Sequence, residues 1–138
     1  MTFLLDTNVV SENTRPKPSP EVLAWRRQYS DVDFALSSVT VYELRHGIER
    51  KAEGRDKARL AAFFNRLLEA FGERVLPFDR EIAEALGGLM ARLEKKGRVI
   101  GLADGIIAAT AHVHNLTLVT RNVADFESTG VRLLNPFE

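Results

Sequence analysis

The 138-residue sequence contains no cysteine. This absence excludes a disulfide scaffold, a zinc site built on thiolates and a cysteine nucleophile. Glycine and proline are few, at 9 and 5 residues, so collagen-like and low-complexity classes are excluded as well. With 45% hydrophobic and 28% charged residues, the composition is that of an ordinary globular protein.

The sequence also has no excess of charge, because 19 Lys and Arg residues stand against 19 Asp and Glu residues. No overall basic character therefore points to a nucleic-acid partner. Long apolar runs are missing too: the stretch 99–111 is interrupted by Asp104 and is shorter than the ~20 residues that a membrane span needs. The first residues lack the basic segment of a secretory signal. We expect a soluble, cytoplasmic protein without membrane contact.

Short apolar runs of the length of a buried strand recur along the chain. They cover residues 3–5, 34–38, 75–78, 116–120 and 131–134, and the turn-forming residues 6–8 are expected to end the first. Helical spacing of apolar residues fills the intervals, at 20–29, 39–51, 60–71, 102–114 and in a helix capped by Asp79 that closes at 95–97. This alternation predicts one α/β domain over residues 1–138, with a central parallel sheet of about five strands flanked by helices.

Four acidic residues are expected at one edge of this sheet. Asp6 follows the first strand, Glu43 lies near the start of the helix after the second, and Asp125 comes five residues after Thr120. Asp104 opens a helix that must run antiparallel to the strand after it, which brings Asp104 to the same edge. Ligands of open α/β sheets bind at the carboxyl ends of the strands. These four acids are therefore the candidate site.

Carboxylates crowded into one pocket repel one another unless a cation lies among them. Oxygen ligands without cysteine favour Mg²⁺ or Mn²⁺. Such a cation can activate a water molecule for attack on phosphorus and stabilise the leaving oxygen. The pattern points to phosphodiester hydrolysis. Taken singly, each acid has an ordinary alternative role, as a turn or cap residue, a solvated helix residue or a charge at a helix N-terminus.

Four segments, in order along the chain, resemble the PIN-domain ribonucleases, specifically the VapC-type toxins of type II toxin–antitoxin modules and their FitB-like relatives. These segments are residues 4–12, 38–47, 100–111 and 120–126. The resemblance implies that Asp6, Glu43, Asp104 and Asp125 form the family's acidic quartet. It implies that Asp6 and Asp104 bind Mg²⁺ or Mn²⁺ directly and that Glu43 and Asp125 act through water. It also implies that Asn8 and Thr120 orient the acids.

The resemblance further implies an activity and partners. It indicates a toxin that cleaves RNA, either transfer RNA or another structured RNA, as a homodimer. A small antitoxin is expected to wrap the toxin with its C-terminal segment, in a hetero-oligomer. Two alternatives stay open: a catalytically silent PIN module that binds RNA or a partner, and a metal-dependent phosphatase that acts on small molecules.

Basic residues follow Glu43 along the chain, from the same predicted helix into the next one. They are Arg45, Arg50, Lys51, Arg55, Lys57, Arg59 and Arg66, and they form either a solvated surface or a track for RNA phosphates. Without the four candidate acids, 15 acidic residues face 19 basic ones, an excess of four positive charges. We therefore expect an acidic pocket set in a mildly basic surface.

Overall fold

The computed structural model describes residues 1–138 and contains five short strands in the order β3-β2-β1-β4-β5. The strands are β1 (Phe3–Leu5), β2 (Phe34–Ser37), β3 (Val75–Leu76), β4 (Thr117–Val119) and β5 (Leu133–Leu134). All four pairings are parallel, and Phe3 of β1 lies opposite both Phe34 and Thr117. The prediction of an α/β fold with a five-stranded parallel sheet is confirmed.

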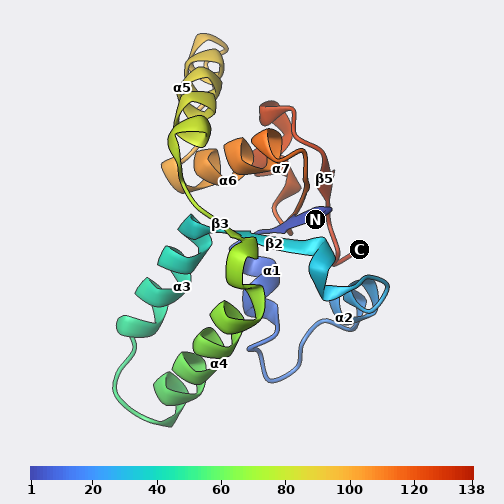
Figure 1. Ribbon diagram of the computed structural model, residues 1–138, viewed down its shortest axis with the longest axis vertical. Coiled ribbons are helices and arrows are strands. Elements are labelled where there is room, and N and C mark those ends of the chain that lie inside the picture. The colour runs from blue at the N-terminus through green and yellow to red at the C-terminus, as the bar shows by residue number, and fades with distance from the viewer.

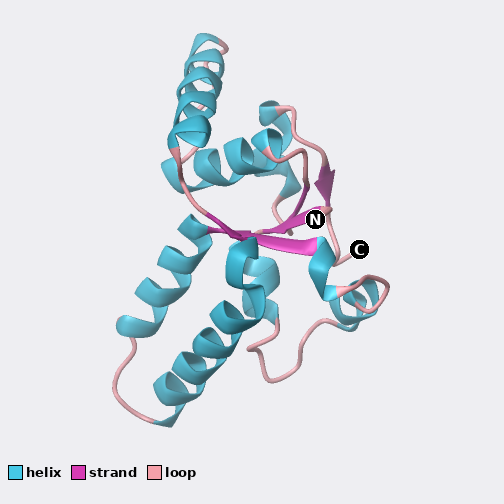
Figure 2. Cartoon of the chain, viewed as in Figure 1, coloured by secondary structure: helices cyan, strands magenta, loops and turns pink.

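Seven α-helices surround this sheet (Figures 1 and 2). They are α1 (Thr7–Glu12), α2 (Pro20–Arg26), α3 (Ser38–Glu49), α4 (Arg55–Phe71), α5 (Arg80–Lys95), α6 (Leu102–Val113) and α7 (Val123–Phe126). Figure 1 shows α1, α3 and α4 on one side of the sheet and α5, α6 and α7 on the other. None of the helices has the length and apolar composition that crossing a bilayer requires.

The structure corrects the prediction for the residues after β1. Residues 6–8 were expected to form a turn, but Thr7 begins α1. The cause is Asp6, whose side chain accepts a hydrogen bond from the backbone N–H of Thr7 at 2.8 Å and so caps the helix. Asp79 acts in the same way for α5, where its carboxylate accepts from the backbone N–H of Ile82 at 3.0 Å. That second cap was predicted and is confirmed.

Other predicted ends were wrong by a few residues. The helix α4 begins at Arg55 rather than residue 60, because its first turn is charged and contributes nothing to the apolar stripe. The strand β3 ends at Leu76 rather than residue 78, since Pro77 has no N–H to offer the ladder. The helix α2 ends at Arg26 instead of residue 29. The four-residue helix α7 was not predicted, because it is too short to show a helical period.

Apolar layers cover both faces of the sheet and bury β1 between them. Leu4 packs in the layer with Leu89 and Ile107 of α5 and α6, whereas Leu5 packs in the layer with Val10 of α1 and Phe71 of α4. Successive side chains of a strand point to opposite faces, which explains the division. Because β1 is fixed on both sides, Asp6 at its carboxyl end has little freedom to move.

The helices α5 and α6 approach closely at Gly105. A Cβ atom at this position would lie 2.9 Å from Cδ1 of Leu86 and 3.1 Å from the sulfur of Met90. A side chain larger than hydrogen would therefore force the side chains of Leu86 and Met90 to shift. The close packing of α6 on α5 at this point helps to place Asp104, which lies one residue earlier.

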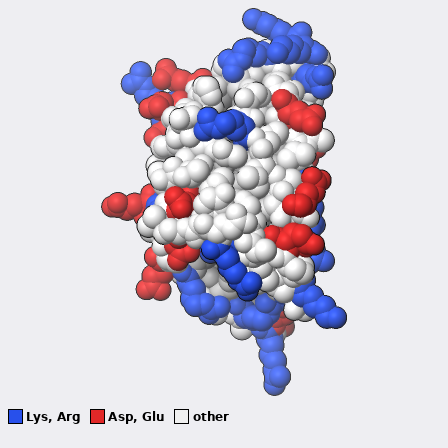
Figure 3. Space-filling model, turned by 90° about the vertical axis from the view of Figure 1, so that its right-hand side faces the viewer, with Lys and Arg blue, Asp and Glu red and all other residues white.

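Charged side chains are unevenly distributed over the surface. On the face drawn in Figure 3, Lys and Arg gather toward the two ends of the long axis, while several acidic side chains lie along the middle. The helix α5 reaches one of these ends in Figure 1, and the connection between α3 and α4 reaches the other. On this face, the basic side chains therefore lie mainly near the end of α5 and near the α3–α4 connection.

Candidate active site

The four predicted acids come together at the carboxyl edge of the sheet. Asp6 is the residue after β1, Glu43 lies on α3, Asp104 lies in the first turn of α6, and Asp125 lies on α7. Their charges interact: Asp6, Asp125 and Glu43 each raise the pKa of Asp104, and Glu43 also raises the pKa of Asp6. The expected convergence is therefore present in the structure.

The four acids differ in exposure. Asp6 is 6% exposed, Glu43 and Asp104 are half-buried, and Asp125 is exposed. Burial is the main cause that raises the pKa of Asp6 and of Asp104, because it disfavours the charged form. None of the four forms an ion pair with a basic side chain. No basic side chain of the protein thus pairs with the negative charge of the pocket.

Asp6 is fixed by three hydrogen bonds. Its Oδ1 accepts from the backbone N–H of Thr7 at 2.8 Å, and its Oδ2 accepts from the hydroxyl of Thr120 at 2.8 Å and from the amide of Asn8 at 3.3 Å. These bonds favour the ionised carboxylate, so they lower a pKa that burial raises. Asn8 and Thr120 thus contact Asp6, and Asp6 serves as a helix cap in addition to its place in the cluster.

Asn8 and Thr120 also hold the loop that leads from β4 to α7. The hydroxyl oxygen of Thr120 accepts from the backbone N–H of Asn122 at 3.0 Å, and Oδ1 of Asn8 accepts from the backbone N–H of Arg121 at 3.2 Å. Through these bonds the side chains that contact Asp6 also determine where α7 begins. The position of Asp125 therefore depends on the surroundings of Asp6.

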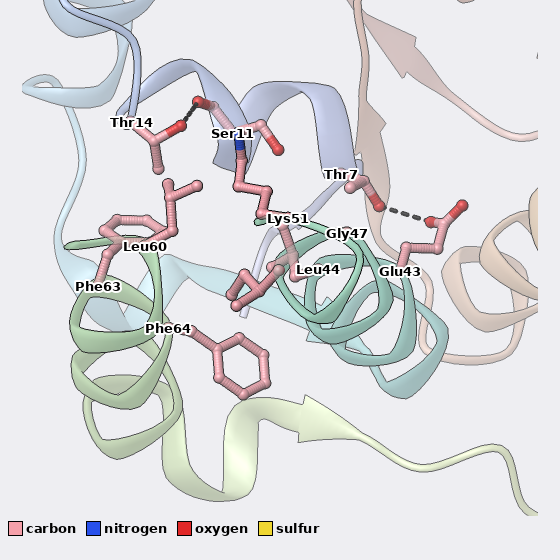
Figure 4. Close-up of a pocket in the computed structure, with 11 residues that line it drawn as sticks. Thr7, Ser11, Thr14, Glu43, Leu44, Gly47, Lys51, Leu60, Phe63 and Phe64 are labelled. Atoms are coloured by element: carbon pink, nitrogen blue, oxygen red, sulfur yellow. Dashed lines mark hydrogen bonds between the residues drawn. The ribbon is translucent and has the colours of Figure 1, made fainter. Parts of the chain in front are cut away.

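Thr7 is a site residue that sequence reasoning missed. Its hydroxyl donates to Oε1 of Glu43 at 2.7 Å (Figure 4). The same hydroxyl lies 3.2 Å from the hydroxyl of Thr40, which is fully buried. The contact joins residues 36 positions apart, so no local pattern could reveal it. The only signal in the sequence was the place of Thr7 directly after Asp6.

A buried acid outside the quartet, Glu12, is a second residue that sequence reasoning did not assign. It is 5% exposed, and its Oε2 accepts from the backbone N–H of Ser19 at 2.8 Å. Guanidinium nitrogens of Arg15 and Arg121 each lie 3.7 Å from its Oε1. Since Arg121 follows Thr120, this ion pair ties the loop after β4 to the end of α1.

A pocket of about 220 Å³ opens beside Glu43, between α1, α3 and α4 (Figure 4). Leu44 and Ile48 of α3 face Leu60 and Phe63 of α4 across it. Gly47 also lines the pocket and leaves it wide, because a Cβ atom there would meet nothing within 4 Å. The pocket has the size and lining to accept an apolar side chain next to the acidic cluster.

The donor set fits a hard divalent cation. No group of three or more Asp, Glu or His side chains is placed to hold one metal ion jointly. The cluster nevertheless consists of carboxylate oxygens, and burial, together with the charges of neighbouring acids, raises the pKa of two of its members, Asp6 and Asp104. A magnesium-like ion uses one or two carboxylates and completes its shell with water, so a ready-made cage is not required.

Comparisons with known proteins agree with this geometry. The PIN domain model matches residues 3–131. The chain is 42% identical to the VapC ribonuclease Y4jK of Sinorhizobium fredii over 140 residues, which cover 99% of this chain and 98% of the relative. It is 39% identical to toxin FitB of Neisseria gonorrhoeae, with 98% of each covered. It is 33% identical to the tRNA(fMet)-specific endonuclease VapC of Salmonella typhimurium, with 95% of each covered.

Solved structures show the same fold. The crystal structure of FitAcB from Neisseria gonorrhoeae superposes with a TM-score of 0.93 at 38% identity, covering 99% of both chains. A toxin-antitoxin complex from Klebsiella pneumoniae superposes with a TM-score of 0.74 at 25% identity, covering 99% of both. The likeness therefore spans the whole chain rather than the site alone.

Proposed function

The chain belongs to the PIN-domain family, and we propose that it is an endoribonuclease that acts as the toxin of a type II toxin–antitoxin module. The observation that carries this proposal is the convergence of four carboxylates, none of them in an ion pair, at the carboxyl edge of the sheet. Relatives named as ribonucleases and as a toxin, alike over nearly the whole chain, support it.

Mg²⁺ or Mn²⁺ is the proposed cofactor. When bound, such an ion supplies Lewis acidity that favours deprotonation of water and offsets charge on the phosphate. Asp6 and Asp104 would hold it, as the likeness to PIN-domain ribonucleases implies, and a cation there would offset the burial that disfavours their charged forms. Glu43 and Asp125 would act through water molecules around it.

Hydrolysis joins the oxygen of a water molecule to phosphorus and breaks the bond to one ribose oxygen, which leaves with a proton from solvent. Glu43 orients the attacking water and accepts its proton, and its carboxylate is already fixed for this task by the hydroxyl of Thr7. Asp125, the exposed member, completes the pocket on the side open to substrate. Asn8 and Thr120 hold the carboxylate of Asp6 in place by hydrogen bonds while Glu43 takes up the proton of the attacking water.

Transfer RNA or another structured RNA of the cytoplasm is the proposed substrate. The support is the relative that is named as a tRNA(fMet)-specific endonuclease. The acidic cluster lies at the edge of the sheet and one of its acids is exposed, so an RNA strand can reach it from solvent. A small-molecule phosphatase would instead be expected to enclose its substrate.

An antitoxin is the proposed protein partner, in a hetero-oligomer with the toxin. The pocket beside Glu43 offers a docking place for one of its apolar side chains, because α3 and α4 leave the pocket unfilled. A peptide anchored there would lie against Glu43 and could cover the acidic cluster. Solved relatives that include a toxin-antitoxin complex support this partner.

A homodimer is the proposed form of the toxin. Exposed apolar side chains lie close in sequence to the acids: Tyr42 precedes Glu43, and Leu102 lies two residues before Asp104. Phe78, also exposed, follows β3, and its backbone N–H donates to Ser38 at the start of α3. Two copies that bury these side chains would bring their sites side by side. The mass of the free protein in light scattering tests this proposal.

RNA cleavage by the purified protein tests the activity. We expect cuts in transfer RNA with Mg²⁺ or Mn²⁺, none with EDTA, and none from Asp6→Asn or Asp104→Asn. Glu84→Gln removes an exposed acid of α5 outside the quartet and is the matched control, which should cleave like the parent. Cleavage that survives both quartet substitutions would overturn the assignment. Metal-dependent RNA binding without turnover would favour a silent module, and hydrolysis of a phosphate monoester without RNA cuts would favour a phosphatase.

A further inference from the structure

The end of α5 carries a basic cluster that the proposed active site does not use. Between residues 92 and 98, four basic side chains stand with one acidic neighbour, Glu94, and all five are exposed. The basic residues are Arg92, Lys95, Lys96 and Arg98. None of them forms an ion pair. The cluster is a local excess of positive charge that the protein leaves open to solvent.

The basic residues of α3, α4 and their connection differ in this respect. Four of those seven side chains are already paired with acids: Arg45 with Glu49, Lys51 and Arg59 with Asp56, and Lys57 with Glu53. Only Arg50, Arg55 and Arg66 lack such a partner. Paired cations attract a polyanion less than free ones, so the end of α5 is the stronger candidate for phosphate contact.

The cluster is built on a rigid turn. The helix closes with Gly97 at φ 69°, and the backbone N–H groups of Gly97 and Arg98 donate to the carbonyls of Glu94 and Leu93 at 3.0 and 2.8 Å. This double closure fixes the chain just past the helix end. Cations within the last turn of a helix stabilise its dipole, but that effect fades beyond the turn and does not account for Arg98.

The turn leads directly back to the acidic cluster. Ile100 is buried, Gly101 precedes α6, and Asp104 follows six residues after Arg98. Figure 1 shows the end of α5 at the top of the molecule, and Figure 3 shows basic side chains gathered at that end. An RNA strand that enters the site beside α6 can therefore continue along the turn toward these cations.

We propose that Lys95, Lys96 and Arg98 at the end of α5 form an RNA-contacting surface that binds phosphates of the substrate beyond the scissile bond. The proposal rests on the endoribonuclease function and deepens it, because it says where a structured RNA is held outside the acidic cluster. Contacts of this kind position RNA without reading its bases. They would favour long or folded substrates over short ones.

The test compares two triple substitutions of equal charge, Lys95→Glu/Lys96→Glu/Arg98→Glu and Arg50→Glu/Arg55→Glu/Arg66→Glu. Both change the net charge alike, so a difference between them reports a local contact rather than long-range attraction. Binding of a fluorescent RNA hairpin is measured with Asp104→Asn as background, so that the RNA stays intact. Salt is varied from about 50 to about 200 mM. Thermal unfolding and light scattering confirm that each protein is folded and has the parent's mass.

We expect the α5 variant to bind the hairpin at least about tenfold more weakly. The slope of log affinity against log salt concentration should become shallower by about two to three, the loss expected for three phosphate contacts. The neutral version, with Gln at the three positions, should show a smaller loss in the same direction. With Asp104 restored, the ratio of kcat/KM for the hairpin over that for a short single-stranded oligoribonucleotide should fall about tenfold.

An α5 variant that keeps the hairpin affinity, or that loses no more than the α3–α4 variant, would overturn the proposal. A variant that keeps RNA affinity but loses affinity for duplex DNA or for the antitoxin would do so as well. Failure of the endoribonuclease function is separate, since it appears as absence of cleavage of the short oligonucleotide by the parent protein.

Discussion

The hydroxyl of Thr7 donates a 2.7 Å hydrogen bond to Oε1 of Glu43, while the backbone N–H of the same residue donates at 2.8 Å to Oδ1 of Asp6. One residue therefore binds two acids of the quartet, Asp6 at the end of β1 and Glu43 on α3. The charge of Glu43 raises the pKa of Asp6, so these carboxylates repel each other. Thr7 holds them together against that repulsion.

Thr7→Val should impair cleavage, because valine has the shape of threonine but cannot donate to Glu43. A hydrogen bond to a charged group contributes about 1.5–3 kcal/mol, so kcat/KM should fall about 10- to 100-fold. Thr7→Ser keeps the hydroxyl and is the matched control, which should stay within a few fold of the parent. Equal activity of the valine and serine variants would show that the bond has no part in the reaction.

Asp104→Asn should abolish cleavage and yet stabilise the metal-free protein. Asp104 is half-buried among three other acids and makes no hydrogen bond that its amide would lose. Removing its charge relieves repulsion, and substitutions that relax a functional site commonly add about 0.5–2 kcal/mol. Thermal unfolding in EDTA measures this gain, and Mg²⁺ should stabilise the parent more than the variant. A variant less stable than the parent in EDTA would contradict this account.

The stability difference between Asp104→Asn and the parent should depend on pH. Burial and neighbouring acids raise the pKa of Asp104 in the folded protein, so the folded state binds more protons than the unfolded chain. The parent is therefore relatively most stable below the unfolded pKa, about 3.9, and loses stability as pH rises through the higher folded value. The variant has no such loss at this position. Denaturant unfolding in EDTA between about pH 4 and 7 should show the gap widening with pH.

Gly105→Ala should damage both stability and activity. The added methyl group would meet Cδ1 of Leu86 at 2.9 Å, and overpacking of this kind typically costs about 1–3 kcal/mol. Displacement of α6 would also move Asp104, and a shift of about 1 Å can cost about 100-fold in rate. Gly87→Ala is the control, since its Cβ meets nothing within 4 Å on α5 and should stabilise the helix by roughly 0.5–1 kcal/mol. If both variants unfold at the same temperature, the close approach is unimportant.

The fold and the four acids could be predicted because both depend on signals local in sequence. Buried parallel strands appear as continuous apolar runs, and a parallel sheet brings the residues after its strands to one edge. The resemblance of four segments then assigned Asp6, Glu43, Asp104 and Asp125 to one cluster, which the structure brings together. Asp79 was predicted as a cap because its signal lies within four residues of its target.

The supporting contacts could not be predicted, because they join segments far apart in the chain. Thr7 meets Glu43 across 36 residues, and Arg121 meets Glu12 across more than a hundred. The sequence alone leaves open whether the basic residues after Glu43 form a solvated surface or a track for RNA phosphates. The structure shows that acids neutralise four of the seven, which composition cannot reveal since pairing depends on geometry.

Gly47→Leu should separate RNA cleavage from control by the antitoxin. Gly47 lines the pocket beside Glu43, and a Cβ atom built there meets nothing within 4 Å, so a leucine can be introduced without a clash at Cβ and would obstruct the pocket. Replacing a glycine inside a helix should itself add roughly 0.5–1 kcal/mol of stability. If the antitoxin places an apolar side chain in this pocket, its affinity should fall about tenfold or more, because one buried anchor can carry more than about 1.4 kcal/mol. Gly87→Leu, on the exposed surface of α5, makes the same change outside the pocket and should bind the antitoxin like the parent. Calorimetric titration of the antitoxin into both variants distinguishes them, and undiminished binding to Gly47→Leu would place the antitoxin on another surface.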